Sequence, residues 1–324
     1  MRYCLLNALG IGAFGTVYRA RERNTNRVFA VKVLVRREEP WDVALALAYR
    51  GEGEILPKLN HSHIIRCFYS HGWGTPRVEI VLTLMDGTLS SLAESPILPR
   101  PLLAKHALHQ MLQALDYLSQ LGYVHRDVKP DNIFYTILPP SRSGPQQPKH
   151  HHHHPSTATT NNSNSTMLLP PPPPPPLHFR LGDFGLCEHE AFIEPGEVRG
   201  TMLYMAPELF DEDPGRRGRP RPWQRQTHKS DVWALYVTVL WVLDLDGIWR
   251  VARRGECSSE GVGFTFTRNL AARVVVDEER VGALREMARV DPWDRVAAGE
   301  VLRGLFGGYG GGGGVPGGWV EELE

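Results

Sequence analysis

The sequence predicts an α+β fold of two lobes, a small antiparallel β-sheet lobe with one helix and a larger, mainly α-helical lobe. Apolar residues alternate on both sides of the first glycines and again over residues 28–35, which is the pattern of antiparallel strands. Over residues 102–121 they recur at three- and four-residue spacing, typical of an amphipathic helix, and Gly122 supplies a stop. Residues 232–243 are apolar on every side, as in a helix at the centre of a lobe.

The composition is that of an ordinary globular protein. Its 324 residues are 42% hydrophobic, which is enough to fill the core of one large domain. Thirty-six Lys and Arg balance thirty-six Asp and Glu, so nothing global predicts the basic surface that nucleic acids or anionic membranes require. The longest apolar stretch, about twelve residues, is too short to cross a bilayer as a helix. Four scattered cysteines without a CxxC pair favour reduced thiols in a cytoplasmic or nuclear protein.

Composition also divides the chain into parts. We expect the first lobe over residues 1–85, the second lobe over 86–137 and 178–306, a low-complexity insert over 138–177, and a glycine-rich flexible tail over 307–324. The insert holds five consecutive histidines and seven consecutive prolines, and it lacks the apolar surface that would offset its ordering entropy. We predict a disordered loop with a stiff polyproline II end. It is either a passive spacer or a docking site for proline-recognition domains.

A glycine motif lies between the first two predicted strands. Gly10, Gly12 and Gly15 form GxGxxG, followed by Val17. Glycines let backbone N–H groups approach phosphate oxygens closely. The strand-to-strand position differs from the strand-to-helix position of a Rossmann motif, and the Walker pattern is absent.

Lys32 lies inside an apolar strand, where an unpaired ammonium group would be costly to bury. It either extends to solvent or meets an anion. Downstream, a short predicted helix carries two carboxylates that can point back toward the lysine. We favour Glu52 as the partner, with Glu54 as the alternative.

The most informative string is HRDVKPDN at residues 125–132, just beyond the amphipathic helix. Asp-Phe-Gly at 183–185 and Ala-Pro-Glu at 206–208 follow in order. With these motifs the sequence resembles the eukaryotic protein kinase superfamily over nearly everything except the insert and the tail. Lys129, two positions after Asp127, resembles the serine/threonine branch.

The resemblance implies a two-lobed protein-kinase-like fold and transfer of the ATP γ-phosphate to Ser or Thr hydroxyls of proteins, with Mg²⁺. It implies that Lys32, held by Glu52, grips the α- and β-phosphates. Asp127 would accept or orient the proton of the substrate hydroxyl, and Lys129 would steady the γ-phosphate. The implied metal ligands are Asn132 and Asp183. The implied nucleotide-binding residues are Leu9, Gly10, Gly12, Gly15, Val17, Ala30, Lys32, Thr83 and Met85.

The same resemblance makes two structural predictions. Adenine would lie beside Ala30 and use backbone groups near Thr83 and Met85, with Leu82 at the back of its pocket. In the second lobe, Glu208 would pair in the interior with Arg295. Loss of either partner would strand a buried charge, so we expect this pair to matter for folding.

The chain departs from the family pattern in two places. The whole insert separates Asn132 from Asp183, although the loop-closure cost grows only logarithmically with length, so the ends can still meet. Residues 186–200 contain no Ser, Thr or Tyr and therefore no phosphorylation site. There, Glu197 either replaces an activating phosphate by pairing with Arg126 or belongs to a solvated acidic loop.

Other functions remain as alternatives. A pseudokinase scaffold would bind partners through the same fold, but the lysine and both aspartates of the motifs are present, which favours an active enzyme. An arginine-rich stretch is a solvated loop, a patch for nuclear import or acidic substrates, or an AT-hook-like DNA binder. Its arginines are Arg216, Arg217, Arg219, Arg221 and Arg225.

Overall fold

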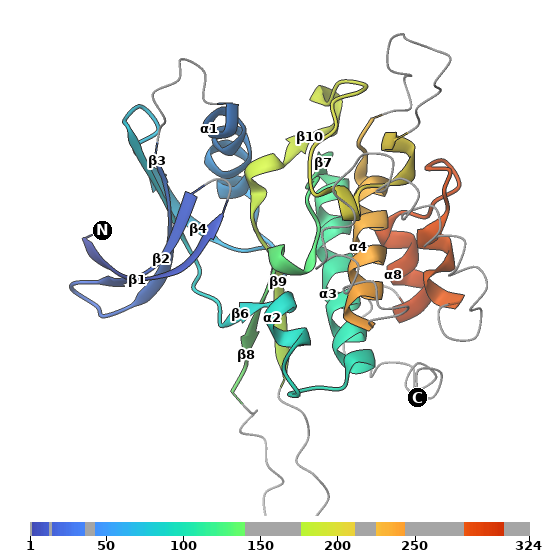
Figure 1. Cartoon of the computed structure of the whole chain (residues 1–324), viewed down its shortest axis with the longest axis horizontal. Helices are drawn as coiled ribbons and strands as arrows, with labels where there is room; N and C mark the ends of the chain where they lie inside the picture. Colours follow the sequence, from blue (N-terminus) through green and yellow to red (C-terminus); the bar gives the residue numbers. More distant parts are fainter. Residues whose placement is uncertain are drawn as a thin grey trace, which may run out of the picture.

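The structure is a computed structural model that describes residues 2–12, 15–35, 43–139, 176–210, 225–243 and 282–307. A β-rich lobe and a helical lobe lie side by side, and the predicted α+β two-lobed fold is confirmed (Figure 1). Residues 170–175 of the polyproline run, most of the arginine-rich stretch and residues 308–324 of the glycine-rich tail lie outside the described residues.

The first lobe is built on a five-stranded antiparallel sheet in the order β1-β2-β3-β5-β4. Its strands are β1 (Tyr3–Gly12), β2 (Gly15–Glu22), β3 (Val28–Val35), β4 (Cys67–His71) and β5 (Arg77–Leu82). Side chains alternate between the two faces of a strand, so the apolar β3 serves two cores. Phe29, Val31 and Val33 join a small cluster on one face, whereas Ala30 and Leu34 join the main core on the other.

One helical segment accompanies this sheet, as predicted (Figure 1). It consists of α1 (Val43–Ala48), the π-helical turn η1 (Tyr49–Ile55) and the short 3₁₀ turn η2 (Leu56–Lys58). The π-helical turn contains Gly51 and Gly53, two residues with low helix propensity. Such wide turns are rare and occur frequently at functional sites.

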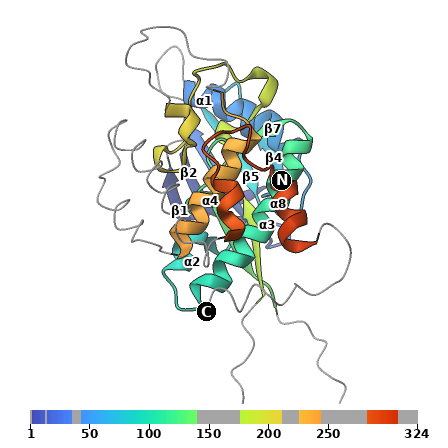
Figure 2. The same ribbon diagram turned by 90° about the vertical axis from the view of Figure 1, so that its right-hand side faces the viewer.

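The second lobe is mainly helical, and α3 packs against both α4 and α8 (Figure 2). Among the described residues, its α-helices are α2 (Leu89–Ala93), α3 (Arg100–Gln120), α4 (His228–Leu243) and α8 (Ala298–Phe306), with the 3₁₀ turn η9 (Gly282–Ala288). The apolar stripe of α3 is buried, as its spacing predicts, and α4 is buried on nearly all sides. Gly122 ends α3 with a φ of 75°, in the left-handed region that favours glycine.

Short strands and turns carry the connections that build the site. These are β6 (Gly87–Thr88), β7 (Tyr123–Val124), η3 (Pro130–Asn132), β8 (Ile133–Ile137), β9 (Leu177–Leu181), η4 (Phe184–Leu186), β10 (Glu188–His189), η5 (Glu190–Phe192), η6 (Met202–Tyr204) and η7 (Pro207–Phe210). Strands β8 and β9 pair in register from Ile133–Leu181 to Ile137–Leu177. The Leu138 N–H then donates to the Pro176 carbonyl over 2.9 Å, so the two ends of the insert do meet.

Two further expectations concern the described residues alone. The cysteines among them, Cys4, Cys67 and Cys187, are free thiols. None of the helices in the described ranges is both long and apolar enough to span a membrane.

A histidine cluster lies where the loop before β4 meets β9. The Nδ1 atom of His63 lies 2.9 Å from the Phe179 carbonyl oxygen. The centroid of its ring is 4.9 Å from that of His178 and 5.7 Å from that of His61. Burial, reinforced by the neighbouring histidines, lowers the pKa of His63 to about 4.

We expect His63 to make the fold sensitive to acid. The unfolded chain protonates this side chain near pH 6.5, whereas the folded chain does so near pH 4, so proton binding favours the unfolded state between these values. The urea midpoint should fall as the pH is lowered from about 7 to about 5, and it should fall less in His63→Asn. Equal falls in the two proteins would contradict this assignment.

Candidate active site

Lys32, in the middle of β3, connects two carboxylates from distant parts of the chain. Its Nζ lies 2.8 Å from Glu52 Oε1 and 2.8 Å from Asp183 Oδ1. The lysine side chain is 8% exposed. Burial alone would lower the pKa of Lys32, but the charges of Glu52 and Asp183 outweigh it and raise the pKa above its usual value. The ammonium group is therefore held charged in the interior.

The helix carboxylate that contacts Lys32 is Glu52. Glu52, the partner that the sequence analysis favoured, therefore forms the ion pair with Lys32, whereas the alternative, Glu54, is exposed. Both residues belong to the π-helical turn, which directs Glu52 inward. Its second carboxylate oxygen, Oε2, is buried and has no hydrogen-bond partner among the described residues.

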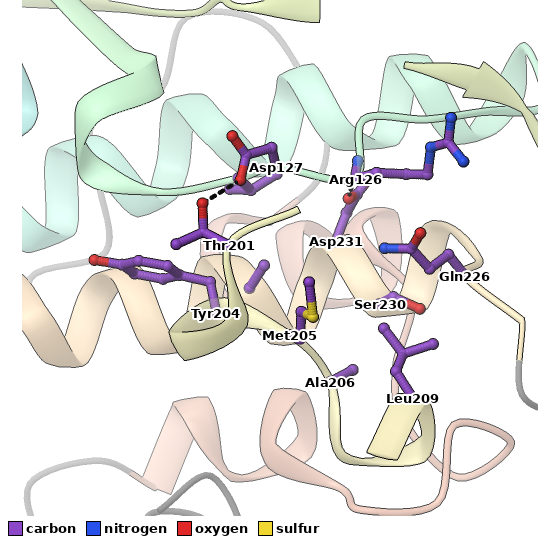
Figure 3. Close-up of a pocket in the computed structure, with 12 residues that line it drawn as sticks. Arg126, Asp127, Thr201, Tyr204, Met205, Ala206, Leu209, Gln226, Ser230 and Asp231 are labelled. Atoms are coloured by element: carbon purple, nitrogen blue, oxygen red, sulfur yellow. Dashed lines mark hydrogen bonds between the residues drawn. The ribbon is translucent and has the colours of Figure 1, made fainter. Parts of the chain in front are cut away.

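Asp127 lies in the loop between β7 and η3 and accepts hydrogen bonds from three side chains. Lys129 Nζ donates to Oδ2 over 2.8 Å, and Asn132 Nδ2 donates to the same oxygen over 2.9 Å. The Thr201 hydroxyl donates to Oδ1 over 2.7 Å, and the two side chains face each other in Figure 3. Lys129 Nζ also donates to Thr201 Oγ1, over 2.7 Å, which closes the cluster.

Asp231, near the start of α4, holds this loop from behind. It accepts hydrogen bonds from the backbone N–H groups of His125 (2.7 Å) and Arg126 (2.9 Å), and it lies beside Arg126 in Figure 3. Burial raises the pKa of Asp231 to about 7, against the effect of these hydrogen bonds. Arg126 has a φ of 69°, a conformation that costs energy for a residue with a side chain. The two bonds to Asp231 stabilise that backbone.

The Asp-Phe-Gly segment lies against the same loop despite the long insert between them. The Gly182 N–H donates to the Asn132 carbonyl over 2.9 Å. The Gly182 carbonyl lies 3.0 Å from His125 Nε2. Because Asp183 follows Gly182 and contacts Lys32, the lysine, both aspartates and Asn132 are joined in one continuous network.

The predicted nucleotide-binding residues lie on the sheet and on the segment that leaves it. The hairpin of β1 and β2 pairs Gly10 with Val17 and Gly12 with Gly15. A Cβ on Gly15, whose φ is 140°, would lie 2.2 Å from the Val33 carbonyl, so no other residue fits there without movement. Leu9 precedes Gly10 in β1, and its side chain is exposed.

At the other side, Ala30 pairs with the buried Leu82 across β3 and β5. Among the described residues, the Thr83 carbonyl and the Met85 N–H have no backbone hydrogen-bond partner, although the Thr83 N–H bonds to the Arg66 carbonyl over 3.0 Å. An acceptor and a donor two residues apart are what a planar base with an amino group and a ring nitrogen can use.

A comparison with family models identifies the fold. Residues 3–306 match the model of the protein kinase domain. The chain belongs to the protein kinase family.

Curated relatives are distant kinases. The serine/threonine-protein kinase MRCK gamma of Homo sapiens is 28% identical over 68% of this chain and 12% of its own length. Serine/threonine-protein kinase 1 of Arabidopsis thaliana is 28% identical over 74% of this chain and 23% of its own length. Aurora kinase of Saccharomyces cerevisiae is 34% identical over 39% of this chain and 34% of its own length. The chain thus spans about a third or less of these relatives.

The cavity drawn in Figure 3 lies beneath the Asp127 loop of this kinase and is lined by Arg126, Thr201 and Asp231 among others. Its volume is about 10 Å³, room for at most one water molecule. It is a packing space behind the site, too small for a nucleotide.

The oxygen atoms left over in the network suit Mg²⁺. Asn132 uses Nδ2 for both of its bonds to Asp127, so Oδ1 has no partner among the described residues. Asp183 uses Oδ1 for Lys32, and its side chain is 30% exposed. Amide and carboxylate oxygens are ligands that Mg²⁺ accepts alongside phosphates and water. Within the described ranges, no cluster of three or more His, Cys, Asp and Glu forms a closed metal cage.

Arg126 forms hydrogen bonds with the activation segment, which we define as residues 186–200. This buried side chain donates from Nε to the Leu186 carbonyl over 2.5 Å and from a terminal nitrogen to Glu197 Oε1 over 3.1 Å. Partial burial opposes ionisation of Glu197, but the hydrogen bonds and charges of Arg126 and Arg199 outweigh it and lower the pKa of Glu197. Glu197 is therefore a charged carboxylate that is paired with Arg126 and Arg199.

Glu208 and Arg295 form a bidentate ion pair in the core of the second lobe. The two Arg295 terminal nitrogens donate to the two Glu208 oxygens over 2.9 and 2.8 Å. The side chains are 4% and 0% exposed. Arg295 also donates to the carbonyls of Arg289, Lys229 and Val290. Every N–H group of the Arg295 guanidinium therefore has an acceptor within the protein.

Two residues at the site were not predicted from the sequence, Thr201 and Asp231. Asp231 did leave a signal, because it is an acidic residue at the start of an otherwise apolar helix, and such a buried carboxylate requires hydrogen-bond donors. Thr201 gave no signal in the sequence, because a threonine in an irregular segment can have many roles.

Proposed function

We propose that this kinase domain transfers the γ-phosphate of ATP to serine or threonine hydroxyls of proteins. The observation that carries the proposal is the network that links Lys32, Asp183, Asn132 and Asp127. Two observations support the serine/threonine branch. Lys129 stands two positions after Asp127, and two of the relatives are serine/threonine-protein kinases.

The residues present fit the roles that phosphoryl transfer requires. Lys32, kept charged by its two carboxylates, would bind the α- and β-phosphates. Mg²⁺, when held by Asn132 and Asp183, supplies charge neutralisation on the phosphates. Asp127 would accept or orient the proton of the attacking hydroxyl, and Lys129, next to it, would steady the γ-phosphate. The Thr201 hydroxyl would keep the Asp127 carboxylate correctly oriented.

The test is incubation of the purified protein with Mg-ATP and degenerate peptide libraries that differ only in the acceptor residue. We expect phosphate in the Ser and Thr libraries and none in the Tyr library. Phosphate in the Tyr library alone would refute the assignment. ATP binding without transfer would favour the alternative, a pseudokinase scaffold.

We further propose that the kinase is active without phosphorylation of its activation segment. Residues 186–200 contain no Ser, Thr or Tyr, and Glu197 provides Arg126 with the negative charge that a phosphate would provide. The proline run as a docking site and an intracellular location remain predictions from the sequence.

Glu197→Ala should lower kcat/KM about tenfold, because it removes a charge-assisted hydrogen bond worth roughly 1.5 kcal/mol to the buried Arg126. Peptide phosphorylation by the purified, dephosphorylated protein measures this effect. Glu194→Ala is the matched control, since Glu194 is an exposed carboxylate of the same segment. If Glu197→Ala were as active as Glu194→Ala, the phosphate-mimic role would be excluded.

A further inference from the structure

Gly51 lies immediately before Glu52 in the π-helical turn and is buried. A Cβ built on it would lie 1.7 Å from the Phe184 carbonyl oxygen and 2.8 Å from the Phe184 carbonyl carbon. The turn therefore rests directly on the backbone of the Asp-Phe-Gly segment. Since glycine is disfavoured inside a helix, its presence here calls for a local reason.

Any other residue at position 51 would separate these two segments. Carbon and oxygen atoms that are not bonded do not approach within 3.0 Å, so the backbones would have to part by more than about 1 Å. The obstructing atoms belong to the main chain, which cannot turn away as a side chain does. On the same turn, Arg50 forms an ion pair over 3.0 Å with Glu188, which follows the Asp-Phe-Gly segment in the chain.

The contact between Gly51 and Phe184 joins the two segments whose carboxylates bind Lys32. Glu52 follows Gly51, and Asp183 precedes Phe184. Both carboxylates lie 2.8 Å from the same ammonium group. If Gly51 and Phe184 move apart, Glu52 and Asp183 move apart too, and one of them loses Lys32.

We propose that Gly51 is a positioning residue for the transfer reaction, because its missing side chain allows Glu52 and Asp183 to reach Lys32 at the same time. The inference rests on the proposed function for its kinetic consequence only. The geometric consequence, the seating of η1 on Phe184, is independent of catalysis.

The test compares Gly51→Ala with Gly53→Ala. Both substitutions raise the helix propensity of the same turn by the same amount. A Cβ at Gly53 would meet ring atoms of Trp73, at 2.8 Å, and of Tyr49, and these side chains can rotate. We expect Gly51→Ala to lower kcat/KM about 100-fold, and Gly53→Ala to change it no more than about threefold, because catalysis is sensitive to misplacements of about 1 Å.

Amide hydrogen exchange provides a second readout that needs no activity. In Gly51→Ala, peptides that cover η1 and Phe184 should lose protection, whereas peptides from α3 and α4 should keep it. In Gly53→Ala, all of these should match the wild type. If the wild type transfers no phosphate, the proposed function fails while exchange still tests the role of Gly51.

Three results would overturn the inference. The first is a Gly51→Ala protein with wild-type rate and wild-type exchange. The second is an equal loss in both variants, which would indicate a general need for a flexible turn. The third is loss of protection in α3 and α4 as well, which would make Gly51 a requirement for folding.

Discussion

Asp127→Asn should bind Mg-ATP nearly as tightly as the wild type and lose phosphoryl transfer by at least about 10³-fold. The side chain of Asn is nearly the same size, and it can still accept hydrogen bonds from Lys129, Thr201 or Asn132 in the second lobe. It cannot accept the proton of the attacking hydroxyl. Lys32, which we propose binds the nucleotide phosphates, donates to Glu52 and Asp183, and this substitution changes neither of them. Isothermal titration with Mg-ATP and peptide phosphorylation by the same sample separate the two effects.

The control for this prediction is Asp116→Asn. Asp116 lies on α3, where its carboxylate accepts a hydrogen bond from Gln120 over 2.8 Å and takes no part in the network around Lys32. It should retain the wild-type rate. An Asp127→Asn protein that retained a tenth or more of the wild-type rate would show that this carboxylate is not the catalytic group.

Arg295→Met should destabilise the fold by about 3–5 kcal/mol, because it leaves the Glu208 carboxylate charged and buried without its partner. The lost cation–π contact of Arg295 with Trp233, at 5.1 Å, adds to the effect. The double variant Glu208→Gln/Arg295→Met should be less destabilised than the sum of the two single variants, because each single variant leaves one buried charge without its partner and the double variant leaves none. Urea unfolding followed by circular dichroism measures all three proteins.

Arg289→Met is the matched control. Arg289 forms a comparable pair with Glu286, at 2.9 Å, but both side chains are 47% exposed. An exposed pair contributes little to stability, so the urea midpoint should hardly move. Equal destabilisation by Arg289→Met and Arg295→Met would contradict the role assigned to the buried pair.

The fold was predictable because its signals are local. Alternation in β3 and three-and-four spacing in α3 each depend on a few neighbouring residues, and the structure has a strand and a helix there. The rarer turn η1 was predicted only as a helix, because nothing in the run of Gly51 and Gly53 distinguishes a π-helical turn from an α-helical one.

The site was predictable where a buried charge requires a partner. An ammonium group inside β3 implies a nearby anion, and Glu52 lies beside it. The seating of Gly51 on Phe184 and the support of the Arg126 backbone by Asp231 depend on segments that are distant in the sequence. Their spacing carries no signal, since backbone carbonyl and N–H groups are the same at every position.

Single-turnover phosphorylation by the wild-type protein tests the central claim most directly. Protein in excess over Mg-ATP is mixed with a Ser/Thr acceptor peptide, and labelled peptide is counted against bound ATP. If Lys32, Asp127 and Asp183 act at one site, each bound ATP should yield about one phosphopeptide, and omission of Mg²⁺ should abolish transfer. Stoichiometric binding of Mg-ATP without any phosphopeptide would contradict the account.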